Sequence, residues 1–159
     1  MIVKGIIDED FINYKKPSML IAFPYCSFKC DKECERAVCQ NSPLANEPNI
    51  EIPEEKIIGR YVSNPITEAI VLQGLEPFDS TFSVLYLIRT LRIKYNCHDD
   101  VVIYTGYNKE EINKSIIEEL KFLGHVIIKY GRYIPDQEPH YDEVLGVNLA
   151  SDNQYAERL

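Results

Sequence analysis

Four of the five cysteines in this 159-residue chain lie within a single stretch of fourteen residues. They are Cys26, Cys30, Cys34 and Cys39, and the fifth, Cys97, stands alone. Thiolates are soft ligands that suit zinc and iron–sulfur clusters, and clustered cytosolic thiols bind metal more often than they form disulfides. Cysteines with only a packing role behave as small apolar residues and have no reason to gather. The grouping therefore indicates a metal or iron–sulfur site.

The spacing of the four cysteines favours a cluster over a zinc ion. The pattern is C-x3-C, then one cysteine after three more residues and another after four. Structural zinc sites draw paired cysteines from two separated arms, whereas these four share one loop. Two forms of cluster site stay open. Four thiolates can ligate every iron, or three can leave one iron free for a substrate, like the open position of a catalytic metal.

The rest of the chain alternates between strand-like and helix-like patterns. Apolar runs predict strands over Ser18–Phe23, Ala69–Gln73, Val101–Tyr104 and Val126–Tyr130. Periodicity and capping residues predict helices over 53–63, 80–94 and 108–124, the last with Asn108 and Glu111 as a capping-box pair. Alternating strands and helices form mainly parallel sheets. Four such units cannot close an eight-unit barrel, so the expected fold is α/β, with an open sheet or partial barrel.

Each predicted strand is followed by a distinctive loop. The cysteine loop (24–49) follows the first strand, and the sequences GLEP, YTGY and YGRY follow the next three. Loops after parallel strands gather at the carboxyl edge of the sheet, where ligands bind. We therefore expect one composite site in a single domain of residues 1–159, with the C-terminal segment (131–159) covering part of the sheet or its opening.

The composition excludes several classes of protein. Asp and Glu number 25 against 17 Lys and Arg, which gives a net charge of −8. This acidic balance argues against binding to nucleic acid or to an anionic membrane, since both need a basic face. The first residues lack the apolar run of a signal peptide, and no stretch approaches the roughly 20 apolar residues of a membrane span. The expected location is the cytoplasm.

The cysteine loop resembles that of the radical S-adenosylmethionine (SAM) enzymes, and within them the small activating proteins of anaerobic ribonucleoside-triphosphate reductase. That family has a C-x3-C-x2-C loop after its first strand, and its third cysteine is followed by any residue and then Asn. This chain has Cys26-x3-Cys30 and Cys39-Gln40-Asn41, with the second interval lengthened to eight residues. The resemblance implies that Cys26, Cys30 and Cys39 hold a [4Fe–4S] cluster. Cys34 is then a bystander or an alternative ligand.

Three later segments carry the same resemblance. GLEP is similar to the family's GGEP motif, which contacts the amino group of SAM, and YTGY matches a run that lies near SAM. Ser151-Asp152-Asn153-Gln154 resembles an S-x-N-Q run, whereas Tyr130 replaces the acid of a D-G-R-F segment. The SAM-binding residues implied by this resemblance are Gly74, Leu75, Glu76, Pro77, Tyr104, Thr105 and Gly106.

The resemblance also implies an activity. The expected enzyme is an oxidoreductase that cleaves SAM reductively and generates a glycyl radical on a partner, anaerobic ribonucleoside-triphosphate reductase. Its electron donor is then of the flavodoxin or ferredoxin type. Two alternatives stay open: a radical SAM enzyme that acts on a different protein or small molecule, and a non-enzymatic module that binds zinc or an iron–sulfur cluster.

Overall fold

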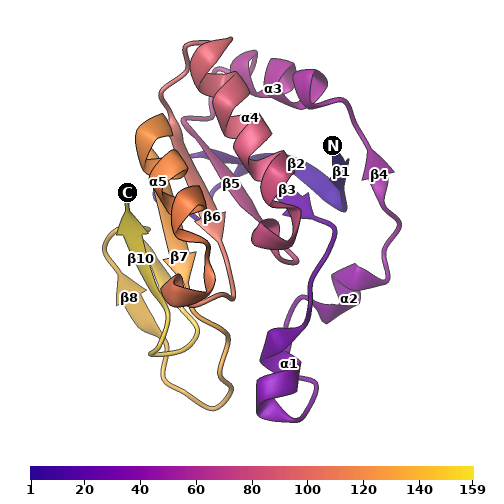
Figure 1. The fold of residues 1–159 in the computed structure, drawn as a ribbon, viewed down its shortest axis with the longest axis vertical. Coiled ribbons are helices and arrows are strands. Elements are labelled where there is room, and N and C mark those ends of the chain that lie inside the picture. Colours follow the sequence, from indigo (N-terminus) through magenta and orange to yellow (C-terminus); the bar gives the residue numbers. More distant parts are fainter.

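The computed structural model describes residues 1–159 and shows a mixed α/β fold built on one six-stranded sheet (Figure 1). The strand order is β10-β7-β6-β5-β3-β2. The four central strands are parallel: β3 (Ser18–Phe23), β5 (Ala69–Gly74), β6 (Asp100–Tyr104) and β7 (Val126–Tyr130). The predicted strands and their mainly parallel pairing are confirmed.

Both edges of the sheet are antiparallel strands that the sequence analysis did not anticipate. They are β2 (Gly5–Asp10), which pairs with β3, and β10 (Tyr155–Arg158), which pairs with β7. Two further pairs lie outside the sheet: β1 (Ile2–Val3) with β4 (Ile50–Glu51), and β8 (His140–Asp142) with β9 (Val147–Leu149). The sheet is open at both edges, and the curvature of a partial barrel stays a prediction.

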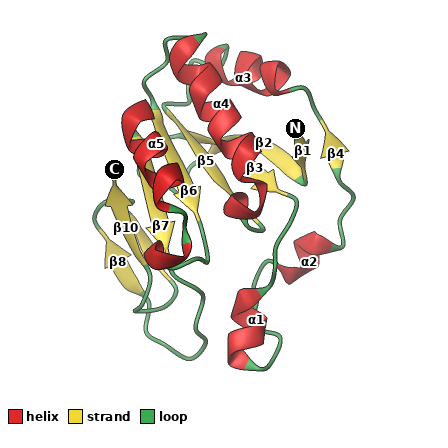
Figure 2. Cartoon of the chain, in the orientation of Figure 1, coloured by secondary structure: helices red, strands yellow, loops and turns green.

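Three helices cover one face of the sheet (Figure 2). They are α3 (Glu54–Val62), α4 (Thr81–Ile93) and α5 (Lys114–Leu123), with the 3-10 turn η1 (Pro77–Ser80) leading into α4. A core of 22 buried residues lies between these helices and the sheet, whereas the cluster on the other face has only seven. The helical face is therefore sealed, and the second face is only partly covered. No helix combines the length and apolar character needed to cross a membrane.

The helix predicted over 108–124 is wrong at its start. Residues Lys109–Glu111 form a separate 3-10 turn, η2, and α5 begins only at Lys114. Ile112 between them is extended and buried, so its side chain packs into the core instead of continuing a helix. Asn113 caps α5, and its Oδ1 accepts from the Ser115 amide at 3.0 Å. The Asn108–Glu111 pair forms, but it caps the short turn.

A buried carboxylate joins three distant segments at the amino end of the sheet. Asp100, at the start of β6, accepts hydrogen bonds from Tyr14 Oη at 2.9 Å, Lys16 Nζ at 2.8 Å and Arg158 Nη1 at 2.6 Å. Burial by itself would raise the pKa of Asp100, but these donors outweigh it and hold the pKa below its usual range. Asp100 thereby ties the segment before β3 and the terminal strand β10 to the centre of the sheet.

Replacing this carboxylate with an amide will weaken the fold in a pH-dependent way. We expect Asp100→Asn to lower the free energy of unfolding at pH 7 by about 1–3 kcal/mol, since Arg158 and Lys16 are themselves half-exposed. The pKa of Asp100 is lower in the folded protein than in the unfolded chain, where it is about 3.9. Asp100 therefore stabilises the fold fully above pH 3.9, and this stabilisation decreases as the pH falls from there toward the folded-state pKa. Urea unfolding from pH 7 to pH 3 measures the difference. The exposed Asp136→Asn, whose carboxylate pairs only with Arg36 at the surface, is the control and should change little.

Candidate functional site

The partly covered face of the sheet contains a cavity of ≈ 630 Å³. Side chains alternate across a strand, so Met19, Ile21 and Phe23 of β3 enter the helical core, while Leu20 and Ala22 line the cavity. The neighbouring strands contribute Gln73, Tyr104 and Lys129 to the same lining. The cavity runs to the carboxyl edge, where it meets the cysteine loop.

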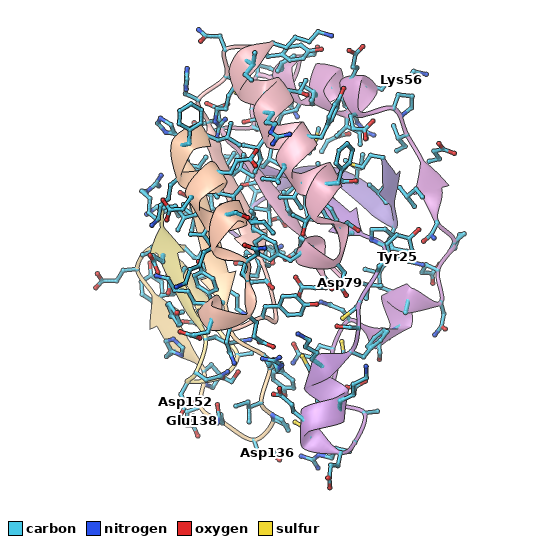
Figure 3. All side chains as sticks on the ribbon, viewed as in Figure 1. Tyr25, Lys56, Asp79, Asp136, Glu138 and Asp152 are labelled. Atoms are coloured by element: carbon cyan, nitrogen blue, oxygen red, sulfur yellow. The ribbon has the colours of Figure 1, made fainter.

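The cavity brings together three of the four clustered cysteines. Cys26, Cys30 and Cys39 line it, whereas Cys34 lines a separate cavity of ≈ 210 Å³ that Cys30 also reaches. All of the thiols are free and half-buried. In Figure 3 sulfur atoms gather between the helix α1 and the edge of the sheet. The three cysteines that the resemblance implies as ligands therefore share one cavity, and Cys34 does not line it.

The long interval between Cys30 and Cys39 is folded back by one carboxylate. The segment begins with the short helix α1 (Lys29–Cys34), which is flanked on both sides by residues in the left-handed region, Phe28 and Glu35. Asp31 Oδ1 accepts from the amides of Val38 and Cys39, each at 2.8 Å. These bonds return the chain to its starting point, so Cys39 comes back to the cavity despite the extra residues. A second short helix, α2 (Ser42–Ala45), follows.

Burial and backbone amides act in opposite directions on the three thiols. Burial raises the pKa of Cys26 to about 11, although the Phe28 amide donates to its Sγ at 3.2 Å. Burial likewise raises the pKa of Cys30 and of Cys39, against amides of Tyr133 for the first and of Asn41 and Ser42 for the second. A thiolate at these positions needs a positive partner, and a metal provides one.

Glu76 of the GLEP turn is a buried connector. Only 3% of the residue is exposed, and its Oε1 accepts from Thr105 Oγ1 at 2.7 Å and from the Phe78 amide at 3.0 Å. Its Oε2 accepts from the Gly106 amide at 2.9 Å. Burial raises the pKa of Glu76, and the three donors oppose that rise. The carboxylate therefore joins the ends of β5 and β6.

The backbone of the GLEP turn is pinned to the start of the cysteine loop. The Glu76 amide donates to the Tyr25 carbonyl at 2.6 Å, and Asn41 Nδ2 donates to the Gly74 carbonyl at 2.7 Å. Gly74 has φ +91°, and a Cβ there would lie 2.9 Å from backbone atoms of Ala22 and Phe23. A glycine is required where β3 and β5 approach this closely.

Asp79 of η1 joins the cysteine loop to the loop after β6. Asp79 Oδ2 accepts from the Ser27 amide at 2.8 Å, and Tyr107 Oη donates to Asp79 Oδ1. Tyr25 and Asp79 both lie at this edge of the sheet in Figure 3. Of the two tyrosines in the YTGY run, only Tyr104 lines the cavity, and its hydroxyl donates to the Asn13 carbonyl at 2.5 Å. Thr105 and Gly106 line the cavity as well, whereas Pro77 does not.

The last two motifs meet behind the cysteine loop. Arg132 forms a two-bond pair with Glu111 at 2.6 Å and reaches Glu33 of α1 at 3.1 Å. Gln154 Oε1 accepts from the Ala150 and Ser151 amides. Arg132 thus holds α1 through Glu33. Gln154 fixes the turn at Ala150–Ser151, and Ala150 and Gln154 line the cavity.

One family model matches most of the chain. It is the 4Fe-4S single cluster domain, and it matches residues 18–154. The chain belongs to this family. The cluster domain is accordingly an iron–sulfur protein whose family binds one [4Fe–4S] cluster. Comparisons with curated proteins and with solved structures find no match.

The residues of the cavity fit such a cluster. No group of three or more His, Cys, Asp and Glu side chains lies close enough to hold a single metal ion. A [4Fe–4S] cluster instead takes each thiolate on a different iron, and three thiols share the lining of one cavity. The turn after β6 borders these thiols as well, since a Cβ on Gly106 would lie 3.6 Å from Cys30 Sγ, an ordinary contact distance. The assignment of Cys26, Cys30 and Cys39 as ligands stays a prediction.

Several residues of the site were missed by the sequence analysis. Asp31, Asp79 and Lys129 all position loops or line the cavity, yet none belongs to the motifs that predicted it. Asn41 belongs to the Cys39-Gln40-Asn41 motif, but its bond to Gly74 was not anticipated. Asp31 accepts from amides seven and eight residues later, and Asp79 and Lys129 depend on contacts between segments far apart in the chain.

Single replacements of the four cysteines will distinguish the two forms of cluster site. We expect Cys26→Ser, Cys30→Ser and Cys39→Ser to lower iron and sulfide content at least about tenfold after anaerobic reconstitution, since each removes a ligand. Cys34→Ser should retain the wild-type content because Cys34 lies outside the cavity. Iron analysis and the absorption spectrum provide the measurement. Equal losses in all four variants would contradict three-cysteine ligation.

The Glu76 connector predicts a stability effect. We expect Glu76→Gln to lower the free energy of unfolding by about 1–3 kcal/mol, because one amide oxygen cannot replace two acceptors and an NH₂ group would face a donor. Urea unfolding of the variant measures this. The exposed Glu138→Gln is the control, and an equal effect in both variants would refute the buried connector.

Proposed function

We propose that this chain is a radical SAM enzyme that generates a glycyl radical on an anaerobic ribonucleotide reductase. The observation that carries the proposal is the separation of the cysteines. Three line one cavity together with the GLEP and YTG loops, and Cys34 faces another cavity. Three-thiolate ligation leaves one iron open, which is the general mark of a catalytic metal site.

The cavity supplies polar groups suited to the amino group of SAM. A carboxylate has about four acceptor positions, and Glu76 uses three of them: two on Oε1 and one on Oε2. The remaining position on Oε2 can accept from an ammonium group, a charge-assisted bond in a buried setting. The volume of ≈ 630 Å³ lies in the range of small-molecule sites, about 300–1,000 Å³.

The bound cluster and SAM would together supply a one-electron reductive cleavage that yields a 5′-deoxyadenosyl radical. The residues of this chain hold, orient and shield those groups. Backbone amides directed at the thiols influence the reduction potential. The buried carboxylate of Glu76 keeps the ends of β5 and β6 beside the cysteine loop.

The mouth of the cavity favours a polypeptide substrate. Ile7 on the edge strand β2 and Ile12 in the following turn line the cavity, yet they are 52% and 78% exposed. Exposed apolar side chains around an opening are typical of a protein-binding site. A glycine-bearing loop of the reductase would enter here, with reducing equivalents from a flavodoxin- or ferredoxin-type donor.

Low-temperature EPR of the reconstituted, dithionite-reduced protein tests the proposal. We expect a [4Fe–4S]⁺ signal that changes shape when SAM is added, and 5′-deoxyadenosine among the products. With the reductase present, a glycyl radical signal should follow. Cys34→Ser should behave like the wild type, whereas Cys39→Ser should give neither response.

Three outcomes would point to the alternatives. A cluster signal that is indifferent to SAM would indicate full ligation and an electron-transfer or structural role. Cleavage of SAM without a glycyl radical on the reductase would instead indicate a different protein or small molecule as the substrate. Zinc in place of iron would indicate a non-enzymatic binding module.

A further inference from the structure

Cys34 lies outside the proposed ligand set, yet it is one helical turn away from a member of that set. Cys30 and Cys34 occupy positions i and i+4 of α1, so both thiols lie on the same face of this helix. They also line the same cavity of ≈ 210 Å³. Cys30 is the one member of the ligand set that lines both cavities, so it is the ligand that Cys34 can reach.

The smaller cavity gives small polar molecules access to the two thiols. Both cysteines are free and half-buried. Glu33, whose side chain is 61% exposed, also lines this cavity, which connects it to solvent. Asn153 lines it as well, and its Oδ1 is buried without a hydrogen-bond partner in the chain. A polar cavity with an unused acceptor suits a small hydrogen-bond donor such as water or hydrogen peroxide.

The helix that carries the two thiols can move by the small amount that a disulfide needs. Cβ atoms at positions i and i+4 are roughly 5–6 Å apart, whereas a disulfide brings them to about 3.5–4.5 Å. The helix α1 has six residues, none of them buried, and is flanked by Phe28 and Glu35 in the left-handed region. A helix this short, without core contacts, opens at low cost, so the thiols can meet.

We propose that Cys30 and Cys34 form a reversible oxidation site that protects a cluster ligand when the cluster is lost. Hydrogen peroxide oxidises the Cys30 thiol to a sulfenic acid and releases one water. The Cys34 sulfur then attacks the Cys30 sulfur, the S–O bond breaks, and the hydroxyl leaves as a second water with the proton of Cys34. The two thiols lose two electrons and the peroxide gains them. A dithiol reductant restores both thiols by exchange.

Capture by Cys34 stops the oxidation at a reversible stage. A sulfenic acid without a neighbouring thiol proceeds to sulfinic and sulfonic acids, which dithiols do not reduce. A disulfide of Cys30 with Cys26 or Cys39 would occupy two thiols of the larger cavity. The disulfide with Cys34 occupies only one of them, and its other half is a thiol outside the proposed ligand set.

Peptide mapping of the peroxide-treated protein tests the inference. Trypsin cleaves after Lys29, Lys32 and Arg36, so each of the four clustered cysteines falls on a different peptide. The cluster-loaded chain is treated with hydrogen peroxide, its remaining thiols are alkylated, and the digest is analysed by mass spectrometry with and without dithiothreitol. We expect peptide 30–32 joined to peptide 33–36, and the pair should separate on reduction.

Recovery of the cluster provides a second readout. After peroxide treatment each protein is reduced and reconstituted anaerobically, and its iron is measured. We expect Cys34→Ser to regain at least about threefold less iron than the wild type, because its Cys30 is oxidised beyond the sulfenic acid. Cys97→Ser is the matched control and should recover like the wild type, since Cys97 lines neither cavity.

Three results would overturn the inference. One is a disulfide that joins Cys30 to Cys26 or Cys39 in place of Cys34. Another is equal recovery of iron in the wild type and in Cys34→Ser. The third is a loss of iron from Cys34→Ser before any peroxide is added, which would overturn the three-cysteine ligand set as well. Binding of SAM enters none of these measurements, so a failure of the proposed function is distinguishable from a failure of this inference.

Discussion

The buried carboxylate of Glu76 is the interaction on which the candidate site depends. Through its side chain it joins the end of β5 to the Thr105–Gly106 turn after β6, and through its amide it holds Tyr25 at the start of the cysteine loop. Three loops thus converge on one residue that is almost inaccessible to water. Because a buried carboxylate is expensive unless its acceptors are used, this convergence is rigid. The bond from the Glu76 amide to Tyr25 fixes the chain directly before Cys26.

The open side of the fold follows from an imbalance between the two faces of the sheet. Helices α3, α4 and α5 seal one face with a large apolar core, as crossover connections of one hand require. The other face receives only the turn around Tyr14 and the hairpin of β8 and β9. The uncovered part becomes the cavity, and polar side chains on this face, such as Lys129 and Tyr104, project into it. Because side chains alternate along each strand, one residue packs in the apolar core and the next faces the cavity.

The cysteine loop combines local structure with distant support. Its own segment contains Asp31, which returns Cys39 to the cavity. Distant residues support it from three directions: Asp79 holds Ser27, Gly74 accepts from Asn41, and Arg132 pairs with Glu33. The turn at Asp31 closes off the eight residues between Cys30 and Cys39, so both of these cysteines line the same cavity.

Much of this protein was determined by local sequence patterns. The four parallel strands are continuous apolar runs, and their order along the chain placed the cysteine, GLEP and YTGY loops at one edge, since parallel strands share a direction.

The split between η2 and α5 could not be predicted, because Ile112 leaves helical geometry for a core contact that only the folded chain provides. The edge strands β2 and β10 are half-exposed and lack a continuous apolar run, so their pairing is decided by neighbours and not by their own pattern. Spacing alone leaves the four cysteines equivalent, and only the resemblance to a family motif singled out Cys26, Cys30 and Cys39. The tertiary structure places these three at one cavity and Cys34 at another, which Cys30 also lines. That division depends on hydrogen bonds from Asp31 and on side-chain direction, which linear spacing does not encode.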